Sequence, residues 1–296
     1  MRERRRPQPV KEIAMNDGPF RYCLNTSTVR GHGLALVEEV ELVAEAGYDG
    51  IEPWIREMDA HVAGGGSLED VAGRAGDLGL AIENAIGFFE WIVDDDALRR
   101  KGFEEARRNM EMLARLGCPR LAAPPYGAAD VEGLDLMAAA DRYAELVEVG
   151  AEFGVAPMVE FWGMSRSLRR LGEAVCVAVQ SGRREACVLA DVFHMYKGGS
   201  PFEGLALLGP DAIGLMHVND YPDAPAAELT DADRVYPGDG AAPLVQILRD
   251  LDAIGFRGPL SLELFNESYW TQEAAAVART GLDKLRALVE EAVPEA

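Results

Sequence analysis

Positive charge is scarce in this sequence. The 296 residues carry 29 lysines and arginines against 50 aspartates and glutamates, which gives a formal net charge of −21 at pH 7. Such a surface repels phosphate backbones and anionic lipids, so nucleic acids and membranes are not expected partners. We therefore expect a small polar molecule as the partner, and a homo-oligomer is compatible with the sequence.

Cysteine is also scarce, and long apolar runs are missing. Cys23, Cys118, Cys176 and Cys187 stand far apart, without the close spacing of a zinc knuckle or a disulfide scaffold, which indicates a reducing, cytoplasmic setting. The basic, proline-containing segment 1–19 is not followed by an apolar stretch. We predict that this segment is a loose tail rather than a signal peptide or a membrane anchor.

From residue 20 onward, short apolar runs alternate with longer amphipathic stretches, which is typical of repeated strand and helix units. The eight predicted strands are 21–25, 48–53, 80–85, 119–124, 156–161, 186–191, 212–218 and 258–264. Eight strand–helix pairs match a (β/α)₈ TIM barrel, whereas an open doubly wound sheet more often has a glycine-rich first turn. We therefore predict α/β class and a single (β/α)₈ catalytic barrel over residues 20–296.

Four consecutive predicted strands, the fifth to the eighth, each end on a metal-binding residue type: Glu160, Asp191, His217 and Glu263. In a TIM barrel these strand ends meet at the carboxyl-terminal face. Any one of these residues alone would more often be an ion-pair partner, but burying all four costs several kcal/mol per charge unless a cation is shared. Three carboxylates and an imidazole suit Mn²⁺, with Mg²⁺, Co²⁺ or Zn²⁺ as alternatives.

The tryptophans suit a polyhydroxylated ligand. Trp54, Trp91 and Trp162 follow predicted strand ends, and Trp270 lies just past the eighth strand, so all four are expected at the mouth of the barrel. Aromatic faces pack against the C–H faces of sugars and leave the hydroxyls free for hydrogen bonds. Trp54 and Trp162 are therefore candidate substrate-binding residues, with packing between loops as the structural alternative.

Three polar residues at the same face are further candidates. Glu52 ends the second predicted strand and is a candidate hydroxyl ligand. The connection 219–241 is unusually long, which favours a functional loop or lid, and its Arg234 is a candidate for binding the substrate. Asp220 is a candidate for orienting His217 through a ring nitrogen. A local hydrogen bond, an ion pair and a loop cap are the respective structural alternatives.

Five motifs carry a resemblance to a known family over nearly the whole chain. They are VEF at Glu160, DVFH at Asp191 and His194, HVND at His217 and Asp220, RVYPGDG at 234–240, and SLELF at Glu263. On these motifs the sequence resembles the xylose isomerase-like sugar phosphate isomerase/epimerase barrels. The resemblance implies that the four strand-end residues bind the metal, that His194 faces the substrate, and that the two glutamates exchange protons with the substrate.

Proton abstraction next to a carbonyl is the chemistry that such a site supports, because a cation on the carbonyl oxygen and a neighbouring hydroxyl stabilises the enediolate. Glu160 and Glu263 on opposite faces of the carbon would invert it, return of the proton to the adjacent carbon would isomerise, and loss of a β-hydroxyl would dehydrate. Ketose 3-epimerases differ from this sequence at Arg166 and Asp223, which speaks against free ketohexose epimerisation.

We therefore predict a metal-dependent isomerase or epimerase of a sugar or keto-polyol. A lyase on the same scaffold is the alternative, either inosose dehydratase-like or a β-eliminating keto-sugar or keto-glycoside lyase. A non-catalytic carbohydrate-binding or sensor protein is a third interpretation, and it would lack a stoichiometric divalent metal.

Overall fold

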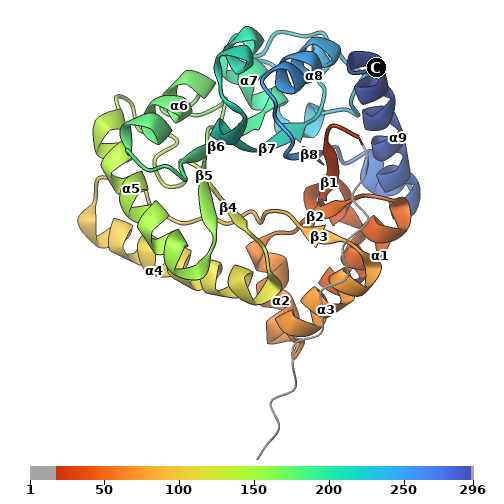
Figure 1. Cartoon of the computed structure of the whole chain (residues 1–296), viewed down its shortest axis with the longest axis horizontal. Coiled ribbons are helices and arrows are strands. Elements are labelled where there is room, and N and C mark those ends of the chain that lie inside the picture. The colour runs from red at the N-terminus through yellow and green to blue at the C-terminus, as the bar shows by residue number, and fades with distance from the viewer. Residues whose placement is uncertain (1–17, 295–296) are drawn as a thin grey trace, which may run out of the picture.

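Residues 18–294 are described by the structure, a computed structural model, and they form parallel strands surrounded by helices (Figure 1). The strands are β1 (Arg21–Asn25), β2 (Gly50–Glu52), β3 (Ala81–Ile82), β4 (Arg120–Ala123), β5 (Ala156–Glu160), β6 (Cys187–Asp191), β7 (Ile213–Val218) and β8 (Pro259–Leu262). The α-helices are α1 (Leu36–Ala46), α2 (Ile55–Ala63), α3 (Leu68–Leu78), α4 (Asp96–Leu116), α5 (Leu136–Phe153), α6 (Leu171–Gln180), α7 (Val192–Gly198), α8 (Leu244–Ala253) and α9 (Ala274–Ala292). The 3-10 helices are η1 (Thr26–His32), η2 (Phe202–Leu207), η3 (Pro210–Ala212), η4 (Asp231–Asp233) and η5 (Tyr269–Thr271).

The predicted tail, residues 1–19, falls mainly on residues 1–17, which lie outside the described residues. The division into a tail and one barrel domain over 20–296 therefore stays a prediction. Within the described part, no helix is both long and apolar enough to cross a lipid bilayer.

The strands form one sheet in the order β3-β2-β1-β8-β7-β6-β5-β4. Its two edges meet where the backbone N–H of Ala122, in β4, donates to the carbonyl oxygen of Ala85 at 3.0 Å. The helices lie around the outside of the strands (Figure 1). This arrangement confirms the predicted fold class, a single (β/α)₈ TIM barrel.

Each predicted strand overlaps an observed one, and β3 is shortened the most, to Ala81–Ile82 from the predicted 80–85. The chain beyond Ile82 still bonds to the β2 side, where the Glu83 N–H donates to the Ile51 carbonyl at 3.0 Å. On the other side, the guanidinium of Arg120 donates to the Glu83 carbonyl at 3.1 Å. The Arg120 side chain thus occupies the carbonyl oxygen to which a backbone N–H of β4 would donate in a regular sheet. The regular pairing of β3 therefore ends early.

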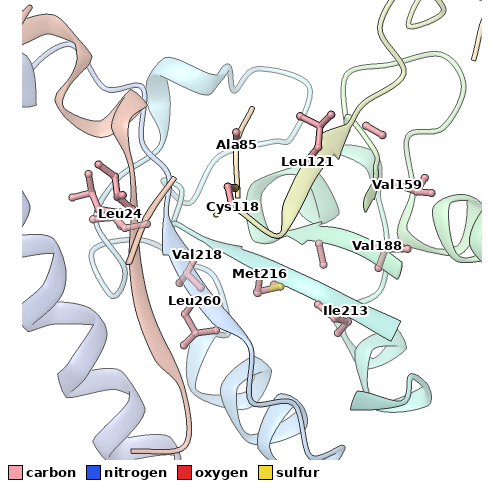
Figure 2. Close-up of a cluster of buried hydrophobic side chains, with 14 of the residues drawn as sticks. Leu24, Ala85, Cys118, Leu121, Val159, Val188, Ile213, Met216, Val218 and Leu260 are labelled. Atoms are coloured by element: carbon pink, nitrogen blue, oxygen red, sulfur yellow. The ribbon is translucent and has the colours of Figure 1, made fainter. Parts of the chain in front are cut away.

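Two apolar cores lie on the two sides of the strands. Val159, Val188 and Met216 belong to the large core between strands and helices, and Figure 2 shows these side chains on their strands. Met158, Leu189 and Leu215 belong to a smaller cluster on the other side. Because side chains alternate along a strand, the residues two positions after these three point to the inside of the barrel at its carboxyl-terminal end. These residues are Glu160, Asp191 and His217.

The outer helices begin and end at positions that the sequence marks. Helix α4 is capped by Asp95, whose carboxylate accepts from the N–H groups of Ala97 and Leu98, and it ends at Gly117, which has a φ of 69°. Glycine adopts that left-handed conformation without a steric penalty. These local signals explain why the helix boundaries, and through them the strand ends, follow from the sequence.

Candidate metal centre and active-site pocket

A pocket of about 390 Å³ opens at the carboxyl-terminal ends of the strands. It is lined by Trp54, Ile86, Phe88, Ala129, Glu160, Trp162, Met164, His194, Asp231, Arg234, Glu263 and Phe265. Five predicted site residues from the second half of the barrel line this pocket: Glu160, Trp162, His194, Arg234 and Glu263. Trp54 contributes from the end of β2.

Asp191 ends β6 and begins α7 with one side chain. Its Oδ1 accepts the backbone N–H of His194 at 2.8 Å, so the three-residue spacing of the two residues is that of an N-cap. Its Oδ2 faces the site and accepts from Arg234 Nη1 at 2.9 Å and from Asn219 Nδ2 at 3.3 Å. Burial raises the pKa of Asp191, but Arg234 and His194 outweigh burial and hold it far below its usual value.

His217, in β7, is fully buried between three carboxylates. Its Nε2 lies 3.0 Å from both carboxylate oxygens of Glu52, so this nitrogen carries a proton and donates it. Its Nδ1 lies 3.4 Å from Asp191 Oδ2 and 3.2 Å from Glu263 Oε2. Burial lowers the pKa of His217, but Glu263 and Glu52 raise it well above the usual value.

A divalent cation fits this arrangement. One ligand atom each from Asp191, His217 and Glu263 lies within 4.8 Å of the others, and all three residues are buried. His217 Nδ1 makes no hydrogen bond, although it faces two carboxylate oxygens. Such a nitrogen and two acidic oxygens repel one another unless a proton or a cation lies between them. Oxygen and imidazole donors are those that Mn²⁺, Mg²⁺, Co²⁺ and Zn²⁺ accept.

Glu160, the fourth predicted ligand, lines the same pocket but is not part of that closely spaced group. Its Oε1 accepts from Trp162 Nε1 at 3.0 Å, and its buried Oε2 has no hydrogen-bond partner. Burial raises the pKa of Glu160 to about 8, although the nearby His217 lowers it. The structure therefore brings three of the four predicted ligands together and leaves the fourth as a buried acid beside them.

Arg234 is the cation that balances these carboxylates. It is 1% exposed, and its Nη1 donates to Asp191 Oδ2 at 2.9 Å and to Glu263 Oε2 at 2.8 Å. Its Nη2 donates to Asp231 Oδ1 at 2.6 Å and lies 3.3 Å from His194 Nε2. Because His194 Nε2 accepts, its proton is on Nδ1, which has no partner, and burial lowers the pKa of this histidine.

Glu52 does not reach the pocket. It is fully buried beneath His217 and accepts hydrogen bonds from Asn25 at 2.8 Å, Asn84 at 2.6 Å and Ser261 at 2.6 Å. Burial raises the pKa of Glu52, but the charge and hydrogen bond of His217 lower it below its usual value. The structure thus places this candidate hydroxyl ligand where it orients a histidine instead.

Asp220 does not orient His217, so that prediction is wrong for this structure. Its carboxylate accepts hydrogen bonds of 2.8 to 3.0 Å from the backbone N–H groups of Tyr221, Gly238, Gly240 and Ala242. A Cβ at Gly240 would lie 2.2 Å from the Tyr221 carbonyl, so glycine is needed there. Asp220 therefore ties the two ends of the long loop that carries Arg234 together. Both oxygens of its short side chain are used by backbone N–H groups of this loop, so they do not bond to His217.

Asn25 is a site residue that sequence reasoning missed. Its Nδ2 donates to Glu52 at 2.8 Å and to Glu263 at 3.1 Å, and its Oδ1 accepts from Trp54 Nε1 at 2.9 Å. The side-chain amide of Asn25 thus contacts the candidate metal ligand Glu263, the buried Glu52 beneath His217, and Trp54 in the pocket wall. Asn25 ends β1, so the strand-end rule that found the other ligands also points to it.

Only two of the four tryptophans reach the pocket. Trp91 is fully buried and donates to the Pro124 carbonyl, while Trp270 donates to the Ser27 carbonyl. The expectation that all four crowd the mouth is therefore wrong. Phe88, Phe265 and Met164 line the pocket instead. Each follows a strand by a few residues in a loop, and sequence position alone does not say which loop side chains turn inward.

Comparisons with known proteins agree with this architecture. A family model described as a xylose isomerase-like TIM barrel matches residues 40–288. An inosose isomerase from Halalkalibacterium halodurans is 28% identical over 271 residues, which cover 89% of this chain and 94% of that protein. A 3-dehydroshikimate dehydratase from Pseudomonas aeruginosa is 28% identical over 260 residues, which cover 86% of this chain and 39% of the dehydratase.

Among solved structures, the IolI protein with a bound zinc atom has a TM-score of 0.86 to this structure at 24% sequence identity. The similarity covers 93% of this chain and 100% of that chain. At this level of identity, the likeness establishes a shared fold.

Proposed function

The chain is an enzyme of the xylose isomerase-like TIM barrel family, and we propose that it is a divalent-metal-dependent isomerase or epimerase of a sugar or keto-polyol. The reaction begins with removal of a proton from the carbon next to a carbonyl. The relative named inosose isomerase supports a cyclic keto-polyol, that is, an inosose or a compound of similar shape, as the substrate.

One observation carries this proposal. At the ends of consecutive strands, Asp191, His217 and Glu263 direct ligand atoms to within 4.8 Å of one another, and the unpartnered Oε2 of Glu160 lies in the adjoining pocket. Buried polar atoms without partners are rare in structural positions and common where a ligand or a proton is handled. We propose these four residues as the metal ligands, with Mn²⁺ as the preferred ion.

A bound divalent metal would lower the free energy of negative charge on the carbonyl oxygen. Glu263 accepts hydrogen bonds from Arg234 and Asn25, which hold its carboxylate in place at the edge of the pocket, so it is the proposed base. Glu160 is the proposed acid, because it lines the same pocket and its buried Oε2 has no hydrogen-bond partner, so this oxygen is free to exchange a proton with the substrate. Return of the proton to the opposite face or to the neighbouring carbon gives epimerisation or isomerisation.

His194 and Arg234 are proposed to hold substrate oxygens. His194 Nδ1 is buried without a partner and carries the proton, so it can donate to a hydroxyl or carbonyl oxygen in the pocket. Arg234 already donates to two carboxylates, and its charge stabilises them close together. Trp162 and Trp54 offer apolar contacts from the same pocket lining.

A dehydratase is the second candidate, and the relative named 3-dehydroshikimate dehydratase favours it. Dehydration shares the removal of the proton next to the carbonyl. It differs in the next step, in which the C–O bond to a β-hydroxyl breaks and water leaves as the double bond forms. The same carboxylates could serve both reactions, so the substrate and the acid that meets its leaving oxygen decide between them.

Exchange in D₂O tests the proposal. The Mn²⁺-loaded protein is incubated with an inosose or with 3-dehydroshikimate, the reaction is quenched with a chelator, and the products are analysed by NMR. We expect deuterium at the carbon next to the carbonyl, with a rearranged ketone from an isomerase or epimerase and loss of water from a dehydratase. Wild-type protein that exchanges no hydrogen of either compound would contradict the proposal.

Two variants provide the matched comparison. Glu263→Gln removes the proposed base and should abolish exchange. Glu132→Gln makes the same chemical change at an exposed side chain that pairs with Arg166, and it should exchange like the wild type. Equal exchange rates in the two variants would exclude Glu263 as the base.

A further inference from the structure

We propose that the substrate carries a planar apolar group, of the size of an aromatic ring, next to its keto-polyol ring, and that Phe88, Trp162 and Met164 bind this group. The inference rests on the proposed function, because it assumes that the polyol ring lies at the charged side of the pocket. It goes further by assigning the apolar side of the pocket to a part of the substrate without hydroxyls.

The pocket has two chemically different sides. Glu160, His194, Asp231, Arg234 and Glu263 form a charged side at the ends of β5 to β8 and in the loop after β7. The other lining residues are apolar, namely Trp54, Ile86, Phe88, Ala129, Trp162, Met164 and Phe265. Phe265 and Trp162 adjoin the charged side through Arg234 and Glu160, whereas Phe88 and Met164 are partly exposed and form the outer rim. A ligand that fills the whole pocket must therefore be polar at one end and apolar at the other.

The apolar side is a connected set of rings. Phe88 contacts Trp54 edge-on at 5.5 Å between ring centroids, Trp162 edge-on at 5.9 Å, and Tyr126 by stacking at 5.3 Å. Trp54 also contacts Phe265 at 6.2 Å. Arrangements of this kind suit the insertion of another flat apolar group, which gains from both area burial and ring contacts.

This side offers few hydrogen-bond donors for hydroxyls. The indole N–H of Trp54 is bonded to Asn25 Oδ1 at 2.9 Å, and that of Trp162 is bonded to Glu160 Oε1 at 3.0 Å. Phe88, Phe265 and Met164 have no N–H or O–H group in their side chains. A hydroxyl buried there would lose its water without a replacement partner, which costs about 1–3 kcal/mol. An apolar group has no such cost.

The rings are held in place from outside the pocket. The guanidinium of Arg30 lies 4.0 Å from the ring centroid of Trp54 and 5.4 Å from that of Phe265. Arg56 lies 4.8 Å from the Trp54 ring. A wall fixed in this way before the ligand arrives loses little side-chain freedom on binding.

The apolar side continues out to the protein surface. Phe88 is 41%, Tyr126 39% and Met164 46% exposed, whereas most large apolar side chains of the described residues are buried. Exposed apolar patches at the rim of a pocket mark places where a ligand or a partner binds. The patch is continuous with the reactive pocket through Phe88 and Met164, which line it. A group attached to the substrate is therefore its occupant.

A pair of ligands that differ only in the apolar group tests the inference. The 3-keto derivatives of methyl β-glucoside and phenyl β-glucoside are cyclic keto-polyols with a small and an aromatic substituent. Isothermal titration of the Mn²⁺-loaded protein should give at least about tenfold tighter binding of the phenyl compound, as expected from the added apolar burial. Equal affinities, or no measurable binding of either compound, would overturn the inference.

Substitutions at the rim provide the controls. Phe88→Ser and Tyr126→Ser should reduce the phenyl-to-methyl affinity ratio towards one, because each removes part of the ring wall. Leu207→Ser alters a side chain that is 88% exposed and does not line this pocket, so the ratio should stay as in the wild type. A ratio unaffected by both rim substitutions would overturn the inference.

Two further readouts separate this inference from its alternatives. If neither keto-glucoside nor an inosose nor 3-dehydroshikimate exchanges deuterium but the affinity ratio stays about tenfold, the proposed function fails and the apolar subsite stands. If both exchange deuterium with equal affinities, the function stands and the subsite fails. If Phe88→Ser converts a dimer to a monomer in sedimentation velocity, a second copy of the chain covers the patch and the inference is overturned.

Discussion

At the amino-terminal end of the barrel, Glu83 lies buried between the first residues of β1 and β4. Arg21 Nη1 is 2.8 Å from one of its carboxylate oxygens, an ion pair without hydrogen-bond geometry, and Arg120 Nη1 donates a hydrogen bond to the other at 3.1 Å. At the carboxyl-terminal end, Glu160 is buried with one oxygen that has no partner. The two ends thus treat a buried carboxylate in opposite ways, although the same eight strands form both.

This difference separates structural charge from reactive charge. A buried carboxylate with an arginine at each oxygen is part of the folded structure, because removing one partner of a buried ion pair leaves an uncompensated charge and is destabilising. An acid with a free oxygen in an enclosed pocket costs free energy unless it binds a ligand, a cation or a proton, and the carboxyl-terminal face is where TIM barrels do their chemistry. The comparison predicts that equivalent substitutions at the two ends change different properties of the protein.

The largest effect is expected at the carboxyl-terminal end. Glu160→Gln and Glu263→Gln should each lower kcat/KM by about 10²–10⁴-fold, because each removes a proton carrier. The midpoint of thermal unfolding should change little in Glu160→Gln, since the unpartnered Oε2 loses no hydrogen bond. Steady-state kinetics and a thermal melt on the same sample check this, and near-normal turnover in both variants would disprove the assigned roles.

A smaller effect is expected beneath the metal centre. Glu52→Gln weakens the acceptor for the Nε2 proton of His217 and places an amide N–H among the donors of Asn25, Asn84 and Ser261. Substitutions of this kind cost about 10–100-fold in metal affinity or activity. Titration of the metal-free protein with Mn²⁺ measures the affinity. Turnover should recover in part at saturating metal, and an unchanged affinity would contradict the role given to Glu52.

The matched substitution at the amino-terminal end should affect only stability. Glu83→Gln leaves one of the two arginines facing an amide N–H, so we expect a loss of about 2 kcal/mol in the free energy of unfolding. Denaturant unfolding measures this loss. At temperatures where Glu83→Gln is folded, its kcat/KM should match that of the wild type. A large fall in kcat of the folded variant would contradict the proposed difference between the two ends of the barrel.

The smallest effect concerns Glu39, a buried acid on α1 near the carboxyl-terminal end. The pKa of Glu39 is raised from 4.5 to about 8, chiefly by burial and also by the charge of Glu57, against the opposing effects of Arg30 and Arg56. Between these pH values the folded protein holds a proton that the unfolded chain has lost, so this group makes stability fall as the pH rises. Glu39→Gln should remove that loss.

Thermal unfolding of the wild type and of Glu39→Gln is measured at pH 5.5 and at pH 8. The second pH lies near the pKa of Glu39, which is about 8. The variant should gain on the wild type by a few degrees at the higher pH, on the scale of about 2–4 °C per kcal/mol. Glu57, whose pKa burial also raises, will leave some pH dependence in the variant. A difference between variant and wild type that is the same at both pH values would show that Glu39 does not titrate in this range.

The sequence by itself determined the barrel and the strand-end residues, because both depend on local periodicity. Apolar runs and glycine stops mark the eight strand–helix units, and the alternation of side chains along β5, β6 and β7 sends Glu160, Asp191 and His217 inward. The N-cap geometry of Asp191 and His194 is likewise local, since it needs only three residues of spacing.

Only the tertiary structure decided how these residues are paired, because pairing joins residues that are far apart along the chain. Glu52 rather than Asp220 holds His217, Asn25 joins two carboxylates from other strands, and the pocket wall is built from Phe88 and Phe265 rather than from Trp91 and Trp270. Side-chain direction in loops and contacts across the barrel follow from the packing of all eight units together, and no local pattern encodes them.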